Sequence, residues 1–185
     1  MCRQQYDADY LSYATKTINT VATLLHRELV NHGRLGACVD ISGILVRMLE
    51  REGIWSCTIT GSLTITFPPI SELESKFFWS IDKGNFVAGH AWVFAPPYTV
   101  VDIAIKQQDF SREERLHLPE MVLSQSKTPV GVEVNEIISP IARQVLKSHG
   151  IPEDNQLSAC LPYFPEIFDC FPAIVEHCPN GSQLK

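Results

Sequence analysis

The chain has 185 residues, of which 45% are hydrophobic and 19% charged, a composition typical of a packed globular protein rather than a disordered one. This length suits one domain spanning residues 1–185. With 15 basic against 21 acidic residues, a formal net charge of −6 and no Lys/Arg run to follow phosphates, nucleic acid is not an expected partner.

Helical periodicity opens the chain. Apolar residues recur at spacings of three and four over residues 9–31, which predicts a long N-terminal helix that stops at Gly33. The same spacing returns over residues 41–49, with Gly53 as a cap. The short link GRLGA between the two therefore places Cys38 at, or within a turn of, the start of a second helix.

Alternating residues then predict strands. Residues 55–67 alternate between apolar and Ser/Thr side chains, which predicts a strand, or two strands joined at Gly61. The runs FVAGHAWVF and YTVVDIAI form a predicted hairpin around residues 95–97. A three-residue turn there would pair His90 directly with Asp102, so that their side chains share a face and touch.

The pattern weakens after Lys106. Residues 111–125 are a helix candidate, residues 130–134 a possible strand, and residues 139–150 a helix opened by Ser-Pro. From residue 151, five prolines and an aromatic cluster predict irregular structure. We expect the whole segment 106–185 to pack on the preceding core, without repeats or a low-complexity linker.

Compartment and cysteine state follow from the same composition. No apolar run approaches the roughly 20 residues that span a bilayer, and MCRQQYDADYLS lacks the pattern of a signal peptide. We therefore expect a soluble, cytoplasmic protein without membrane insertion. A domain of this size needs no disulfides, so reduced thiols are predicted at all six cysteines: Cys2, Cys38, Cys57, Cys160, Cys170 and Cys178.

Cys38 is the candidate nucleophile. At a helix start, backbone N–H groups and the helix dipole favour the thiolate, and they can also hold an oxyanion. His90 could accept the thiol proton, with Asp102 orienting its ring. Asp40 complements the helix dipole but slightly opposes the thiolate, and His32 is a possible oxyanion donor.

Each of these residues also has a purely structural interpretation. A free cysteine is usually a small buried hydrophobe, His90 could be satisfied by backbone groups, and Asp102 could face solvent. Trp92 fits the core better than a substrate platform. The ligand-type residues of the tail lack the spacing of a zinc site, so no metal is predicted there: Cys160, Cys170, His177 and Cys178.

The order of these motifs resembles a known family. The run GACVDISGILVRMLEREGIWSCTITGSL, followed by GHAWVF and VVDIAI, is similar to the core of the transglutaminase-like superfamily of papain-like thiol enzymes. The resemblance covers about residues 34–105. It implies an α+β fold in which a Cys-bearing helix packs on an antiparallel sheet. It also implies Cys38 as nucleophile, His90 as general base and acid, and Asp102 as the group that orients His90.

The resemblance also implies the class of chemistry. The expected reaction is thiol-dependent hydrolysis of a peptide or side-chain amide, or transfer to an amine, with a peptide or protein as substrate and no cofactor. Val39 stands where the animal cross-linking enzymes often have an aromatic residue, so calcium-dependent cross-linking is not implied. Two alternatives stay open: an arylamine N-acetyltransferase-like activity, although the expected Arg-Gly-Gly-x-Cys run is absent and RLGAC stands in its place, and a catalytically silent binding module.

Overall fold

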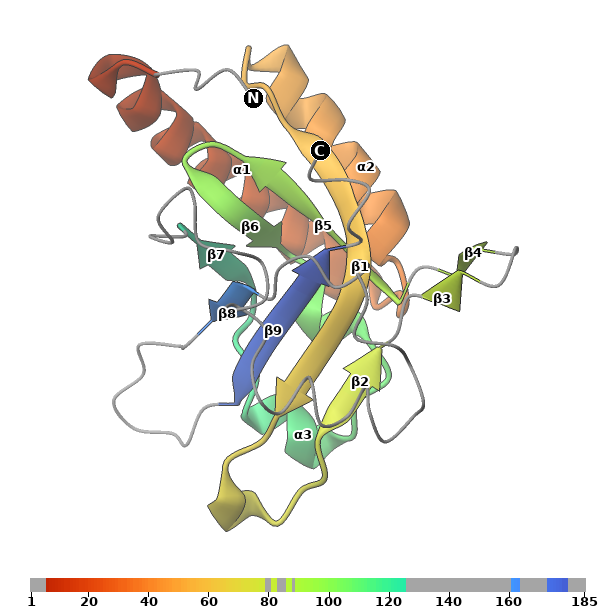
Figure 1. Cartoon of the computed structure of the whole chain (residues 1–185). Helices are drawn as coiled ribbons and strands as arrows, with labels where there is room; N and C mark the ends of the chain where they lie inside the picture. Colours follow the sequence, from red (N-terminus) through yellow and green to blue (C-terminus); the bar gives the residue numbers. More distant parts are fainter. Residues whose placement is uncertain are drawn as a thin grey trace.

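The computed structural model describes residues 6–78, 81–82, 86–87, 89–125, 161–163 and 173–179. The helices are α1 (Ala8–His32), α2 (Cys38–Arg51) and α3 (Arg112–Leu116), with short 3-10 turns η1 (Pro69–Ser71) and η2 (Ile105–Gln107). The strands are β1 (Cys57–Thr66), β2 (Lys76–Phe78), β3 (Ile81–Asp82), β4 (Phe86–Val87), β5 (His90–Ala95), β6 (Tyr98–Asp102), β7 (Val122–Ser124), β8 (Leu161–Tyr163) and β9 (Ile174–Pro179). Helices packed on an antiparallel sheet make this an α+β structure, as predicted (Figure 1).

The two long helices form where the periodicity predicts them. Helix α1 begins after Asp7, whose carboxylate accepts a hydrogen bond from the Tyr10 N–H, and ends at Gly33, whose φ of 68° favours glycine. Helix α2 has Cys38 as its first residue. The apolar face of α2 packs with the core-facing face of β5 in one cluster of buried side chains.

One main sheet carries the site. Its strands lie in the order β7-β6-β5-β1-β9-β8, with β2 also beside β1. On β1, Gly61 lies opposite His90 of β5, and Leu63 lies opposite His177 of β9. Residues directly opposite one another, and residues two apart on a strand, point to the same face, so both histidines lie on one face of the sheet.

This face is the inner side of a curled sheet. A side chain of β6 is hydrogen-bonded to one of β9, although β5 and β1 lie between these strands in the sheet order. The sheet must therefore curve toward this face. A second cluster of buried apolar side chains fills the concave side, with Trp92 as its largest fully buried member. Helices α1 and α2 cover the other side (Figure 1).

The hairpin register differs from the prediction. The turn consists of Pro96 and Pro97 alone, joined by a cis peptide bond, and the register shifts along β5 before pairing resumes. Extending the resumed pairing places Asp102 opposite Trp92, so the predicted direct pairing of His90 with Asp102 is wrong. The two side chains nevertheless share a face as diagonal neighbours, which remain within reach of long side chains.

The later elements also differ in part. The predicted helix over residues 111–125 is wrong beyond residue 116, where α3 ends, and strand β7 follows. Ser111 and Glu114 form a capping box that starts α3, and Pro119 is incompatible with its continuation. The prediction of irregular structure from residue 151 is wrong for β8 and β9. The predicted elements at 130–134 and 139–150 lie outside the described residues.

No helix within the described residues combines the length and apolarity needed to cross a bilayer.

Candidate active site

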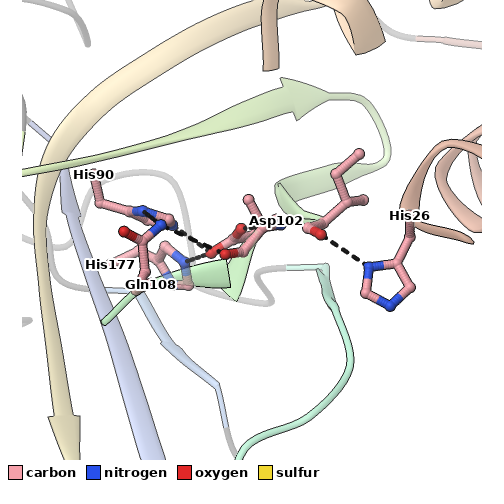
Figure 2. Close-up of polar contacts among 7 residues, drawn as sticks. His26, His90, Asp102, Gln108 and His177 are labelled. Atoms are coloured by element: carbon pink, nitrogen blue, oxygen red, sulfur yellow. Dashed lines mark hydrogen bonds and ion pairs between the residues drawn. The ribbon is translucent and has the colours of Figure 1, made fainter. Parts of the chain in front are cut away.

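Asp102, the last residue of β6, is the centre of a buried polar cluster (Figure 2). Its Oδ2 accepts hydrogen bonds from Nε2 of His90 at 2.7 Å and Nε2 of His177 at 2.8 Å. Its Oδ1 accepts one from the backbone N–H of Ala104 at 2.9 Å, a local turn that ends the strand here. Both histidine side chains are fully buried and Asp102 is 1% exposed. Three donors satisfy the carboxylate, as a buried charge requires.

Cys38 lies against the start of β5. The His90 side chain and the backbone of Ala91 lie close enough to its thiol to stabilise the thiolate. Burial raises the pKa of this thiol, but the hydrogen bond and charge of His90 outweigh burial, so the pKa of Cys38 is lowered. Ala37, the N-cap of α2, offers no capping side chain to the first-turn N–H groups, which stay oriented toward a negative charge. The thiolate of Cys38 is therefore more favoured than that of an isolated cysteine.

The ionisation of His90 and Asp102 is coupled. Burial alone would lower the pKa of His90, but the charge and hydrogen bond of Asp102, with a smaller effect of Cys38, raise it to about 10. Burial would raise the pKa of Asp102, and the charge of His90 together with the hydrogen bond from His177 holds it well below its usual range. His90 is thus a cation beside an ionised carboxylate at neutral pH, and its charge favours ionisation of the Cys38 thiol.

The ring geometry leaves one nitrogen for chemistry. Nε2 of His90 is engaged by Asp102, and Nδ1 lies 3.2 Å from Nε2 of the Gln108 side-chain amide, which leaves Nδ1 as the nitrogen that can serve the Cys38 thiol. The Gln108 amide donates to a neutral ring, and after a half-turn its oxygen accepts from the cation. Gln108 can therefore follow the ring through a change of protonation.

Two contacts fix the loops around the site. The N–H of Gly36, two residues before the thiol, donates to the carbonyl of Gln107 at 2.8 Å. Gly36 has a φ of 68°, a conformation that favours glycine. On the other side, His26 of α1 donates from Nδ1 to the carbonyl of Ile103 at 2.9 Å, directly after Asp102 (Figure 2). The nucleophile and the carboxylate are thus both anchored through backbone groups.

Exposed apolar residues lie near Cys38 in the sequence. Cys38 itself is 6% exposed, whereas Leu35 and Val39, on either side of it in the sequence, are each 50% exposed. Asp40 is paired with Arg34 at 2.6 Å on the surface, which offsets its opposition to the thiolate. Both partners are more than half exposed, so this pair contributes little to stability.

The buried cluster is also the group of described residues whose ligand atoms lie close enough to hold a metal ion. Atoms of His90, Asp102 and His177 lie within 4.8 Å of one another. Each imidazole nitrogen, however, lies at hydrogen-bond distance from the same carboxylate oxygen. We therefore assign this group to hydrogen bonding.

The structure brings Cys38, His90 and Asp102 together, but it places His32, the suggested oxyanion donor, away from them. His32 is exposed at the end of α1 and has no described contact with the site. Two members escaped the sequence analysis: Gln108, and His177, which was considered there only as a possible metal ligand. Alternation along VEH, with His177 on the same face as Val175, is the signal that could have identified a buried histidine.

Comparison of the chain with protein-family models, with curated proteins and with solved structures finds no match in any of the three.

Proposed function

We propose that the protein is a cysteine-nucleophile hydrolase or acyltransferase that acts on a peptide or side-chain amide. One observation carries the proposal: Cys38 begins a helix beside His90, which lowers the pKa of its thiol, and His90 is held by the buried carboxylate of Asp102. The resemblance of residues 34–105 to the transglutaminase-like superfamily, with its papain-like core, supports the same assignment.

The reaction follows from the positions of the groups. The Cys38 thiolate attacks the amide carbonyl carbon, and N–H groups at the start of α2 stabilise the oxyanion. The His90 cation gives its Nδ1 proton to the leaving nitrogen as the C–N bond breaks and a thioester forms. Water, or an acceptor amine, then gives a proton to Nδ1 and attacks the thioester, which restores the thiolate.

Acylation by an activated ester tests the proposal without knowledge of the natural substrate. We expect p-nitrophenyl acetate to give a burst of about one equivalent of p-nitrophenol and one acetyl group on Cys38, found by peptide mass spectrometry. The Cys38→Ala variant should lose the burst, whereas Cys57→Ala should keep it, because burial raises the pKa of the Cys57 thiol.

Other outcomes assign the site differently. No burst at Cys38 contradicts the proposal and favours a binding module on the same fold. Acetylation of Cys38 by acetyl-CoA favours the arylamine N-acetyltransferase-like alternative.

If the burst is present, a library of glutamine-containing peptides identifies the reaction. Release of ammonia indicates a side-chain amide, a cleaved peptide indicates a main-chain amide, and incorporation of a primary amine indicates transfer.

A further inference from the structure

His177 contacts the same carboxylate oxygen as His90, although β9 follows β6 by more than 70 residues. Its Nε2 lies 2.8 Å from Oδ2 of Asp102, and its side chain is fully buried. Figure 2 shows the two imidazoles converging on the carboxylate from different strands. Strand β1 lies between β5, which carries His90, and β9, which carries His177. Its Gly61 has no side chain to separate the two rings, whose centroids are 5.8 Å apart.

Packing holds the His177 ring in place. The ring lies edge-on to Trp92, with 5.0 Å between ring centroids, and Trp92 is itself 1% exposed. Within the described residues, Nδ1 of His177 has no hydrogen-bond partner. The ring is thus held by aromatic packing and by one directional hydrogen bond, the one to Asp102.

The hydrogen bond also defines the proton on the ring. Asp102 is an anion, so its Oδ2 accepts and Nε2 of His177 carries the proton that is donated. A second cation beside His90 would be repelled, and a neutral donor avoids this. Burial, together with the charge of His90, lowers the pKa of His177 despite Asp102, in agreement with a neutral ring.

We propose that His177 is a positioning residue of the active site, which fixes the Asp102 carboxylate against His90 and so makes the reactivity of Cys38 depend on strand β9. This proposal rests on the proposed function. Without the His177 donor, Oδ2 would keep one of its two imidazole partners, and the carboxylate could turn about its remaining hydrogen bonds. The His90 cation, and with it the Cys38 thiolate, would then be less stabilised.

Two substitutions separate hydrogen bonding from packing. His177→Phe keeps a ring beside Trp92 but removes the donor, whereas the amide nitrogen of His177→Gln can occupy the place of Nε2. We expect iodoacetamide alkylation of Cys38 at pH 6 to slow at least about threefold in the Phe variant, with the pH profile moved upward, and to stay within about twofold of wild type in the Gln variant. The alkylation rate of Cys57 is the control for an intact fold: it should be the same in both variants as in wild type.

If Cys38 is alkylated fast in wild type and its pH profile is the same in His177→Phe, the inference is overturned and the proposed function stands. Slow alkylation of wild-type Cys38 overturns the proposed function itself. If the Phe variant does not fold, ¹⁵N NMR of the wild-type imidazoles decides the point: a neutral His177 ring protonated at Nε2 supports the inference, and a cation or an Nδ1–H tautomer overturns it.

Discussion

Replacing Asp102 with alanine is expected to lower the free energy of unfolding by about 3 kcal/mol. The substitution removes a buried carboxylate that accepts from two imidazoles and one backbone N–H, and it leaves these donors without partners. The loss lies at the lower end of the range for a broken buried ion pair, because His90 can release its proton once the carboxylate is gone. Urea denaturation followed by tryptophan fluorescence measures the change.

Asp109 provides the matched control. It lies just beyond η2 and is exposed, so Asp109→Ala should change the free energy of unfolding by less than about 0.5 kcal/mol. Asp102→Asn keeps the shape of the side chain, and we expect it to be less destabilising than alanine while still slowing alkylation of Cys38 at pH 6. Equal stability of Asp102→Ala and Asp109→Ala would show that the buried cluster is not formed.

The second large effect concerns stability against pH. We expect the contribution of Cys38 and His90 to be flat between about pH 6.5 and 8.5, the ordinary pKa values of histidine and cysteine. On the proposed function, the native thiolate and imidazolium hold one proton in that range, and the unfolded thiol and neutral imidazole also hold one. Equal numbers of bound protons give no slope.

Outside this range the two states differ by one proton. Above pH 8.5 the unfolded thiol is ionised while His90, with a pKa of about 10, keeps its proton, so stability falls by about 1.4 kcal/mol per pH unit as pH rises. Below pH 6.5 the unfolded histidine binds a proton that the native pair does not, so stability falls as pH decreases. His177 acts in the same direction there, since its pKa is lowered.

Cys38→Ala is the informative comparison. In the native state of this variant Asp102 still keeps His90 protonated. Without the Cys38 thiolate, the native state then holds one proton more than the unfolded state as soon as the unfolded histidine loses its proton. The decline in stability should therefore begin near pH 6.5 instead of 8.5. Coincident profiles for wild type and Cys38→Ala, measured by urea denaturation at closely spaced pH values, would contradict the thiolate–imidazolium pair.

The sequence contains enough to predict the helices and the proximity of Cys38, His90 and Asp102. Helices α1 and α2 follow from the three-and-four spacing of apolar residues: α1 (Ala8–His32) lies within one residue of the expected bounds, and α2 (Cys38–Arg51) contains the expected pattern over 41–49 and begins at Cys38, within the turn predicted for it. That Asp102 meets His90 was also predictable, because a shift of two positions in a hairpin leaves a residue on the same face. The error in register came from a turn one residue shorter and from the bulge after it.

The remaining site residues depend on long-range packing. His177 reaches Asp102 because β9 pairs with the central strand β1 and the sheet curls, and neither feature leaves a local pattern in the sequence. Gln108 lies in a bend after η2 whose position is set by the contact between Gly36 and Gln107. Such contacts, between segments far apart in the chain, are not determined by the periodicity of any one of them.

The most direct test of the account is the pH dependence of iodoacetamide alkylation at Cys38 and Cys57, resolved by peptide mass spectrometry in wild type and in His90→Gln. We expect fast alkylation of Cys38 at pH 6 in wild type, at least about tenfold slower in the variant, because an ordinary thiol with a pKa of about 8.5 is less than about 1% thiolate at that pH. Cys57 should react slowly in both. Slow alkylation of Cys38, unchanged by His90→Gln, would mean that this cysteine is an ordinary buried thiol at a helix start.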